Sequence, residues 1–383
     1  MKGLKNMKKV LIMYATYGSG HLSAAKAIKN YIDENYDDVE TKLVDCMMYI
    51  NKVINGASVG VYNKITTNTP WLWKKVYYNS KKGILSKISN GSNKLMSKKL
   101  LRLFDEFRPD IVISTHMFST QMIGYLKRKG KVNCGLATVL TDFAPHDQWL
   151  EEHEYGNLFF VSNEGMKESL VNEFKVNSDI VHVTGIPISP KFSTKFNADE
   201  IYENLQLNPE KKTILLFGGR EFGNGRKKIL EVLTSLTKHL DKYQIVAVCN
   251  RNKKTISQFH KIAESLEDSS DLTIYDYLTN VPEVMSISSL VVTKSGGLTS
   301  SESLASSLPV LVINPIPGQE EENAEFLVNA GVAVWLKKKD NTEEIVNNLL
   351  TSPEKLKEMS ENAKKLAHID STKNICDTIL KNL

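Results

Sequence analysis

Four short segments combine glycine with hydroxyl, acidic or imidazole side chains at points where apolar runs end. The first is Gly18-Ser19-Gly20-His21, which links an apolar run to an alanine-rich helical pattern. Its glycines permit a tight turn, and a helix N-terminus offers free N–H groups to an anion. The imidazole of His21 stands at the mouth of this loop and could act as a general base, or it could cap the helix.

A second glycine turn, Gly218-Gly219-Arg220, comes directly after the apolar run that ends at Phe217. Two glycines and an arginine at a strand end suit contact with a diphosphate. The backbone can approach the diphosphate closely there, and the guanidinium can bind two of its oxygens. The alternative is a tight turn whose arginine lies in solvent.

The third segment, Ser295-Gly296-Gly297-Leu298-Thr299, runs from a predicted buried strand into a predicted helix. Its paired glycines allow close backbone approach, its hydroxyls can donate hydrogen bonds, and the helix dipole favours a phosphate at this point. Glu302 lies one turn further on, where a carboxylate could accept both hydroxyls of a ribose. A helix capping box is the alternative explanation of the spacing between hydroxyl and acid.

In the fourth segment, prolines end an apolar run before Gln319, Glu320 and Asn323, which open a helical pattern. Amide and carboxylate groups in such a cluster can bind the hydroxyls of a sugar, because each hydroxyl is both donor and acceptor. Acids that stabilise the helix N-terminus are the alternative interpretation of Glu321 and Glu322. The chain contains no Asp-x-Asp motif, so we expect no bound metal and no cofactor.

The elements that position these segments are short apolar runs that alternate with helical patterns in two successive series. Such alternation predicts the α/β class, with two doubly wound parallel sheets and a crevice between the two domains. The proline-rich segment Gly185–Pro190 separates the series and is predicted to be a hinge. We therefore expect domains at residues 1–187 and 188–383, with terminal helices over about 352–383 that could pack back on the first domain.

The predicted strands of the first series are Val10–Tyr14, Val39–Val44, Ile111–Ser114, Leu136–Leu140, Leu158–Val161 and Ile180–Val183. Those of the second series are Thr213–Phe217, Gln244–Val248, Leu272–Tyr275, Leu290–Thr293, Val310–Ile313 and Val332–Leu336.

The 383 residues are 41% hydrophobic and 24% charged, a composition that excludes a disordered or fibrous chain. No uncharged stretch reaches the roughly 20 apolar residues that a membrane-spanning helix needs. The apolar run after the basic N-terminus ends in a glycine turn rather than a cleavage site, so we expect a buried strand and no secretion. Four widely separated cysteines predict reduced thiols and a cytoplasmic protein.

Positive charge is concentrated between Lys52 and Arg108, where there are twelve basic residues and two acidic ones. Tryptophan and tyrosine favour the headgroup level of a bilayer, and each lysine near an anionic leaflet contributes about 1 kcal/mol. We predict a membrane-binding surface rather than a nucleic-acid site, for which no recognition motif is present. Its residues are Trp71, Trp73, Lys74, Lys75, Lys81, Lys82, Lys98 and Lys99.

The four segments, in this order, resemble glycosyltransferase family 28, and the form Gly-Ser-Gly-His-x-x-Ala-Ala is most similar to its diacylglycerol glycosyltransferases. This resemblance implies a GT-B fold, in which two Rossmann-like domains face a crevice. It also implies that the C-terminal domain binds a UDP-sugar. By that resemblance the diphosphate lies at Ser295–Thr299, the ribose at Glu302, the sugar at Gln319 and Glu320, and the uracil beside the backbone near Leu278. The family's N-terminal histidine, the candidate base, corresponds to His21.

Two further segments bear on the branch of the family. The turn Gly219-Arg220-Glu221 differs from the serine-containing turn of the peptidoglycan branch, which favours the glycolipid branch. Thr141-Asp142 follows a predicted strand and resembles the Thr-Asp motif on the acceptor side of the glycolipid branch. Asp142 would then orient the base or contact the acceptor hydroxyl; the alternative is a cap on the next helix.

The resemblance therefore implies an inverting transfer of glucose from UDP-glucose to the 3-hydroxyl of 1,2-diacylglycerol, and onward to glucosyldiacylglycerol. Together with the basic stretch between Lys52 and Arg108, this predicts a peripheral enzyme that binds anionic membrane lipids on the inner face of the cell membrane. UDP-galactose as donor, as in monogalactosyldiacylglycerol synthase, is an alternative. A UDP-sugar epimerase-like GT-B protein and a membrane-surface sensor of UDP-sugars are others. No nucleic acid is expected among the partners.

Overall fold

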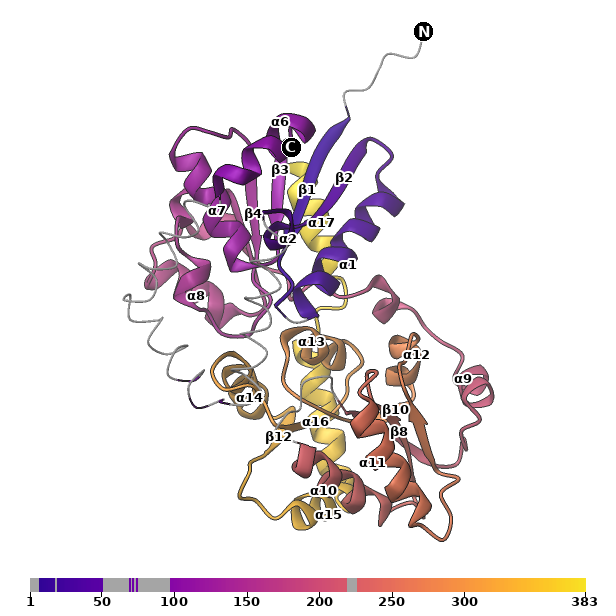
Figure 1. Ribbon diagram of the computed structural model, residues 1–383. Helices are drawn as coiled ribbons and strands as arrows, with labels where there is room; N and C mark the ends of the chain where they lie inside the picture. The colour runs from indigo at the N-terminus through magenta and orange to yellow at the C-terminus, as the bar shows by residue number, and fades with distance from the viewer. Residues whose placement is uncertain are drawn as a thin grey trace. The chain divides into compact units, whose positions relative to one another are not determined.

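The computed structural model describes residues 7–17, 19–50, 69, 71, 74, 97–218 and 226–383. Within these ranges the chain forms two compact units (Figure 1). The first contains residues 7–17, 19–50, 71, 74, 97–190 and 368–383, and the second contains 69, 191–218 and 226–367. Pro190 ends the first unit, where the sequence placed the boundary at residue 187.

The first unit is built on a six-stranded sheet in which every pair of neighbours is parallel. The strand order is β2-β1-β3-β4-β5-β6. The chain therefore moves outward from β1 in opposite directions, and the order reverses between β1 and β3. Ligands of open α/β sheets bind at such a switch point, outside the carboxyl ends of the strands. The strands are β1 (Lys8–Tyr14), β2 (Val39–Asp45), β3 (Ile111–Ser114), β4 (Gly135–Val139), β5 (Leu158–Val161) and β6 (Val181–Val183).

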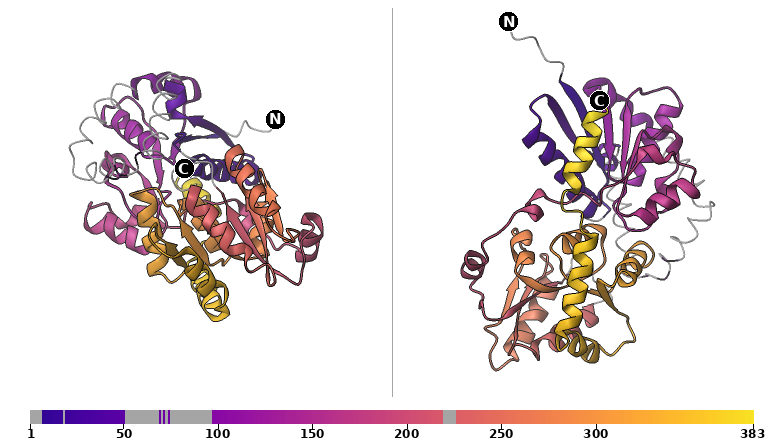
Figure 2. Two further views of the ribbon diagram at one scale, coloured as in Figure 1. Left: turned by 60° about the horizontal axis from the view of Figure 1, so that its bottom comes forward. Right: turned by 180° about the vertical axis from the view of Figure 1, so that it is seen from behind.

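Helices cover both faces of this sheet. On one face, α1 and the C-terminal helix α17 pack side by side over a core that includes Ile12, Ile113 and Phe160 (Figure 2, right). On the other face, α2, α6 and α7 bury Leu11, Val112 and Leu136, and α8 covers Phe159 and Val161. The helices are α1 (Gly20–Asn35), α2 (Cys46–Ile50), α6 (Leu101–Phe107), α7 (Met117–Arg128), α8 (Glu164–Asn172) and α17 (Ser371–Lys381).

The second unit also has a six-stranded parallel sheet, in the order β12-β11-β10-β7-β8-β9. Read from β9, this is the strand order of dinucleotide-binding folds, with the switch point between the first and fourth strands of the unit, β7 and β10. The strands are β7 (Lys212–Phe217), β8 (Tyr243–Val248), β9 (Leu272–Tyr275), β10 (Ser288–Thr293), β11 (Val310–Ile313) and β12 (Ala333–Leu336).

The core of the second unit lies between its sheet and the helices α10, α11, α15 and α16, which contribute Leu233, Phe259, Val346 and Met359. The helices are α9 (Ala198–Leu205), α10 (Arg226–Thr237), α11 (Lys253–Glu264), α12 (Val281–Ser286), α13 (Gly297–Ala305), α14 (Gln319–Asn329), α15 (Thr342–Leu350) and α16 (Pro353–Leu366). The two predicted doubly wound parallel sheets of the α/β class are thus confirmed.

The chain enters the second unit after Pro190 and returns to the first after Ala367. Within the first unit the two connecting segments are held together, because the hydroxyl of Thr372 donates to the carbonyl of Ile188 at 2.5 Å. Gly185 has a positive φ of 80°, and a Cβ at this position would lie 2.4 Å from Cβ of His368. Of the two terminal helices, α16 belongs to the second unit and α17 to the first.

Candidate active site

The switch point of the first sheet is where His21 lies. Helix α1 starts at Gly20, after β1, and Thr115 directly follows β3, the neighbour of β1. His21 Nδ1 lies 2.8 Å from the carbonyl oxygen of Thr115. In return, the hydroxyl of Thr115 donates to the carbonyl of His21 at 3.0 Å. The pairing of β1 with β3 therefore fixes both the ring and the backbone of His21.

This contact determines which ring nitrogen carries hydrogen. A carbonyl oxygen only accepts, so Nδ1 of His21 must donate, and Nε2 keeps its lone pair. Thr141, just after β4, places its hydroxyl oxygen 3.0 Å from the same Nδ1. The side chain is turned toward a neighbouring strand end, and the N-cap residue Ser19 makes no side-chain capping bond. His21 is therefore a candidate base rather than a helix cap.

Aromatic side chains surround His21. His116 packs edge-on against it with ring centroids 4.5 Å apart, and Trp149 lies 6.4 Å away. His116 and Trp149 are buried, and burial lowers the pKa of His21 to about 4, against the weaker opposite effect of its bond to Thr115. Burial and the neighbouring His21 also hold the pKa of His116 well below its usual value. Both imidazoles are therefore neutral at pH 7.

Sequence reasoning did not identify Thr115, His116 or Trp149. The available signal for His116 was its position two residues after the predicted strand Ile111–Ser114. Its proximity to His21 depends on β3 lying next to β1, which strand prediction alone does not give. His116 Nδ1 accepts the N–H of Phe118 at 3.1 Å and so caps α7.

Asp142 is buried one residue after Thr141, which contacts His21. Its carbonyl accepts the hydroxyl of Ser162 at 2.8 Å. The next helical turn, Asp147–Trp149, is capped by the imidazole of His146 rather than by Asp142. Asp142 thus shares a strand end with the His21 cluster. Gly20 begins α1, whereas Gly18 lies outside the described residues.

In the second unit, the two predicted glycine turns follow the strands that flank its switch point. Gly218 comes directly after β7, and its N–H donates to the carbonyl of Val248 at 2.7 Å. A Cβ at Gly218 would lie 3.2 Å from both Thr255 Cγ2 and the Val248 carbonyl, which explains why glycine fits this close approach of two strand ends. Gly219 and Arg220 lie outside the described residues.

The other turn leads from β10 into α13. Gly296 is the N-cap residue, Gly297 begins the helix, and no side chain caps it, so the capping-box interpretation of Thr299 and Glu302 is wrong. Gly296, Gly297 and Thr299 are partly exposed, whereas Leu298 is buried. The first N–H groups of α13 are thus without side-chain caps, which is the arrangement that binds a phosphate at a helix N-terminus.

Glu302 lies in the second turn of α13 and is partly buried. Desolvation by this burial raises the pKa of its carboxyl to about 8. Ser300, on the same helix, has a buried hydroxyl without a hydrogen-bond partner among the described residues. Burial of a carboxyl costs free energy unless a partner compensates for the lost water. A ligand hydroxyl near Glu302 would supply such a partner.

Glu320 links the two predicted ligand-binding segments of this unit. One of its carboxylate oxygens accepts from Lys294 at 2.9 Å, and the other accepts the N–H of Ile316 at 2.7 Å. The hydroxyl of Ser295 donates to the Glu320 carbonyl at 2.5 Å, and Asn323 Nδ2 donates to the Ser295 carbonyl at 3.1 Å. Both Glu320 oxygens are therefore engaged, and Lys294, which sequence reasoning missed, is held beside the glycine turn.

The remaining predicted donor-site residues lie close to these segments. Gln319 begins α14, and Gly318, which precedes it, donates its N–H to Glu321 Oε2 at 3.2 Å. This bond supports the helix-stabilising interpretation of Glu321. Leu278, the predicted neighbour of the uracil, is buried in the loop after β9. The exposed Tyr277 beside it lies under the guanidinium of Arg251, 4.7 Å from the ring centroid.

Only half of the predicted membrane-binding residues can be located. Trp73, Lys75, Lys81 and Lys82 lie outside the described residues. Trp71 is 69% exposed, and Lys74, Lys98 and Lys99 are also exposed. In the described part of the chain, none of the helices combines the length and apolarity needed to span a bilayer. The same residues contain no group of three His, Cys, Asp or Glu side chains arranged to hold a metal.

Each unit matches a known protein family. Residues 21–188 match the family model of monogalactosyldiacylglycerol (MGDG) synthase. Residues 213–375 match that of the glycosyltransferase family 28 C-terminal domain.

Curated relatives match nearly the whole chain. The processive diacylglycerol beta-glucosyltransferase of Bacillus subtilis (strain 168) is 30% identical over 378 residues, which cover 98% of this chain and 95% of that protein. The protein of the same name from Bacillus cereus (strain AH820) is 32% identical over 378 residues, covering 98% and 94%.

Solved structures share the fold at lower identity. Acinetobacter baumannii MurG has a TM-score of 0.65 at 16% identity, with 98% of this chain and 99% of that chain covered. UDP-GlcNAc 2-epimerase from Neisseria meningitidis, solved with UDP-GlcNAc, has a TM-score of 0.62 at 19% identity, with coverage of 98% and 100%. These two structures support the GT-B architecture that the sequence implied.

Proposed function

We propose, for a chain that belongs to the diacylglycerol glycosyltransferases of glycosyltransferase family 28, that it transfers glucose from UDP-glucose to the 3-hydroxyl of 1,2-diacylglycerol. The enzyme then adds further glucose to the resulting glucolipid. The relatives named processive diacylglycerol beta-glucosyltransferase support both steps. The observation on which the chemistry rests is the bond from His21 Nδ1 to the Thr115 carbonyl, which leaves Nε2 free to accept a proton.

An acceptor hydroxyl needs a base because its own pKa is far above 7. In the proposed step, its oxygen bonds to the anomeric carbon of glucose while His21 Nε2 takes its proton. The bond from that carbon to the UDP oxygen breaks, UDP leaves with the electron pair, and the sugar configuration inverts. The lowered pKa of His21 keeps the imidazole neutral before the reaction. Thr115 and Thr141 hold the ring in place, and Asp142 lies beside Thr141 on the acceptor side.

The donor is bound by the second unit. We place the diphosphate at the start of α13, where Gly296 and Gly297 let it approach the backbone N–H groups. Lys294, held by Glu320, adds a positive charge beside this turn. With these donors and no Asp-x-Asp motif, the proposal needs no metal to stabilise the leaving UDP.

Residues of α13 and α14 contact the ribose and the sugar. Glu302 accepts the ribose hydroxyls, which replaces the solvation that its carboxyl loses by burial. Gln319 faces the sugar, together with Glu320, whose carboxylate already holds Lys294 and the loop at Ile316. Asn323 is fully buried and supports this segment from behind, through its bond to the Ser295 carbonyl. Glu320 therefore fixes the shape of the sugar pocket as well as contacting the sugar.

The acceptor is a membrane lipid, so the enzyme must work at a bilayer surface. The concentration of lysines and tryptophans between Lys52 and Arg108 supports peripheral binding to anionic lipids on the inner face of the cell membrane. Trp71 and Lys74 are exposed, as such binding requires.

Product analysis tests this function. The purified protein is incubated with UDP-glucose or UDP-galactose, each with and without diacylglycerol in vesicles, and the lipid products are separated by thin-layer chromatography. We expect mono- and diglucosyl lipids from UDP-glucose, formed at least about a hundredfold more slowly by the His21→Ala variant. Galactolipid as the main product would identify the synthase alternative.

The lipid-free reactions test the other two alternatives. Conversion of the UDP-sugar into its epimer without lipid would identify an epimerase-like protein. Binding of UDP-sugar without any turnover would identify a sensor and contradict the enzyme.

A further inference from the structure

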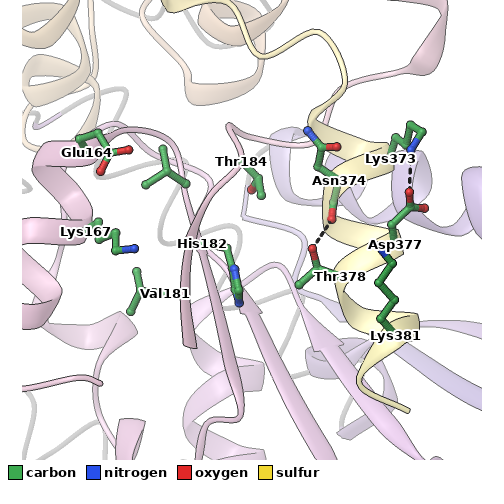
Figure 3. A pocket seen from close by; sticks show the side chains of 11 residues that line it. Glu164, Lys167, Val181, His182, Thr184, Lys373, Asn374, Asp377, Thr378 and Lys381 are labelled. Carbon is green, nitrogen blue, oxygen red and sulfur yellow. Dashed lines mark hydrogen bonds and ion pairs between the residues drawn. The ribbon is translucent and has the colours of Figure 1, made fainter. Parts of the chain in front are cut away.

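A polar groove in the first unit has no part in the proposed reaction. It has a volume of about 500 Å³ and lies between α8, the edge strand β6 and α17. Among the described strands, β6 pairs only with β5, and the groove runs along its other edge. Figure 3 shows Lys167 on one side of β6, the residues of α17 on the other, and His182 between them. None of the residues of the His21 cluster lines it.

The ring of His182 lies at the bottom of the groove, with an aromatic side chain behind it. It stacks on Phe160 of β5, with centroids 5.5 Å apart and planes inclined by 27°. Its Nε2 atom is buried and has no hydrogen-bond partner among the described residues. Burial and the nearby charge of Lys167 lower the pKa of His182, so the ring is neutral at pH 7. A neutral ring adds no charge of its own to the groove, and its buried Nε2 does not reach an occupant.

The charges that face His182 are unevenly paired. On α17, Asp377 accepts from Lys373 and from the hydroxyl of Tyr36, both at 2.6 Å, so its negative charge is compensated. Lys381 on α17 and Lys167 on α8 have no ion-pair partner within the described ranges, and Glu164 on α8 is the remaining acid of the lining. Two ammonium groups with free donors therefore flank an imidazole nitrogen without a partner.

We propose that this groove binds a phosphate group, with Lys167 on α8 and Lys381 on α17 donating to its oxygens from opposite sides of the His182 ring. Two ammonium groups without a carboxylate partner suit an oxyanion better than a neutral sugar, which would also need acceptors. The phosphate belongs either to a small soluble molecule or to the headgroup of a phospholipid. The site is separate from the proposed UDP-sugar site, which lies in the other unit.

The test follows His182 directly. The protein has eight histidines, and the ring signals of 15N-labelled histidine assign His182 by their loss in His182→Gln. Inorganic phosphate is titrated at constant ionic strength, with chloride as the balancing anion. We expect a saturable shift of the His182 signal and a rise in its pKa, because a bound anion favours the protonated ring.

Two lysine variants distinguish binding at a specific phosphate site from a general effect of positive charge. Lys167→Gln should weaken phosphate binding by roughly tenfold, the usual value of one charge-assisted hydrogen bond. Lys129→Gln makes the same charge change at an exposed position of the same unit and should leave binding unchanged. Equal binding by parent and Lys167→Gln would overturn the proposal.

A second arm distinguishes the two sources of phosphate. Phosphatidylcholine vesicles with and without phosphatidylglycerol replace the soluble ion, and the His182 signal is followed again. A response to inorganic phosphate alone assigns a soluble ligand. A response to the anionic vesicles that Lys167→Gln removes and Lys129→Gln keeps assigns a headgroup. If neither changes the His182 signal, the groove is not a phosphate site. Because Lys167 and His182 take no part in transfer, these outcomes are independent of the glucosyltransferase activity.

Discussion

The function of His21 depends on which of its ring nitrogens is free. Nδ1 is committed to the carbonyl of Thr115, and the buried rings of His116 and Trp149 keep water away from one side of the imidazole. The same burial that orients the base also lowers its pKa to about 4. His21 is therefore a weaker base, but one that is unprotonated at every physiological pH.

Replacement of His21 by alanine should lower kcat by roughly 10²–10⁴, the usual contribution of a general base. UDP binding should not change, because the proposed nucleotide contacts lie in the other unit. For the parent enzyme at saturating UDP-glucose, kcat/KM for diacylglycerol should stay constant down to about pH 5 and fall only near pH 4, the pKa of His21. Steady-state kinetics and calorimetry of UDP binding provide the measurements.

Circular dichroism at each pH is the control for this profile. Because His21 and His116 are held neutral in the folded state, the unfolded chain binds more protons, so stability itself falls as pH drops from about 6.5 towards 4. An acid limb at pH 6.5 in a fully folded protein, or near-parent turnover by His21→Ala, would remove this histidine from the role of base. Asp142 would then be the next candidate.

For Glu302 we expect the opposite dependence of stability on pH. Its folded-state pKa of about 8 lies above the ordinary value of 4.5. The folded state therefore holds an extra proton, and stability falls as pH rises from 4.5 to 8. Glu302→Gln should remove this penalty and stabilise the ligand-free protein at pH 8, by on the order of 1–3 kcal/mol, with little effect at pH 5. Urea denaturation at the two pH values measures it.

The same variant should bind UDP and UDP-glucose more weakly, raising KM with less effect on kcat, because a ribose contact acts equally in ground and transition states. Ribose hydroxyls that donate to Glu302 favour its ionised form, so UDP binding to the parent should release a proton below pH 8. Calorimetry in buffers of different ionisation enthalpy detects this release. UDP affinity that is the same in Glu302→Gln and parent would show that the ribose lies elsewhere.

At the scale of elements, apolar runs and turn residues were sufficient to predict the strands but not their order. The strands predicted at Ile111–Ser114, Leu158–Val161 and Val310–Ile313 have the observed bounds. β10 begins two residues before its predicted start, because Ser288 pairs in the ladder although it is polar. The contacts of His21 with Thr115 and of Lys294 with Glu320 could not be predicted, since both join segments that only strand order and helix packing bring together.

The loop after β6 supports a prediction about one glycine. Gly185→Ala should destabilise the first unit, because its φ of 80° disfavours alanine and its Cβ would collide with His368. Gly130→Ala is the matched control: its φ is also positive, at 61°, but no atom lies within 4 Å of the added Cβ. We expect a loss of about 1 kcal/mol for the control, from the backbone alone. The loss should be at least twice as large for Gly185→Ala, and equal losses in thermal unfolding would show that His368 moves away freely.

At the scale of the whole molecule, the basic stretch predicts how the enzyme reaches its lipid. Binding to phosphatidylglycerol vesicles should weaken as salt shortens the Debye length from about 10 Å at 0.1 M to about 3 Å at 1 M. The tryptophans should leave some binding that salt does not remove. Changing four lysines of the stretch to glutamine should reduce both vesicle binding and activity on bilayer-embedded diacylglycerol, without changing UDP affinity. The four are Lys74, Lys75, Lys81 and Lys82.

A variant with the same charge change outside this stretch is the control, and co-sedimentation with vesicles is the measurement. Its four substitutions to glutamine fall on exposed lysines of the second unit, at Lys338, Lys339, Lys355 and Lys357. If both variants bind anionic vesicles as the parent does, the membrane-binding surface lies elsewhere on the chain.

Removal of the C-terminal helix α17 tests whether the first unit depends on residues that follow the second unit in the sequence. A chain that stops after Ala367 lacks α17, whose Ile375, Cys376, Ile379 and Leu380 are buried against the first sheet. Loss of these contacts should destabilise the first unit by on the order of 5 kcal/mol or more, abolishing transfer while UDP binding persists. Stopping after Lys381 removes only exposed residues and should be neutral. Hydrogen exchange resolved by unit separates the outcomes, and unchanged protection of the first sheet in the shorter chain would contradict the prediction.

The return of the chain to its first unit also sets an order for folding during translation. Domains usually fold in the order in which they leave the ribosome. Here the second unit is complete once Ala367 has been made, and nearly all of it is the continuous segment Lys191–Ala367, whereas the first still awaits residues 368–383. The unit that carries His21 is therefore the first to begin synthesis and the last to be complete. Throughout synthesis of the second unit, the apolar sheet face that α17 will cover stays open to chaperones and to other nascent chains.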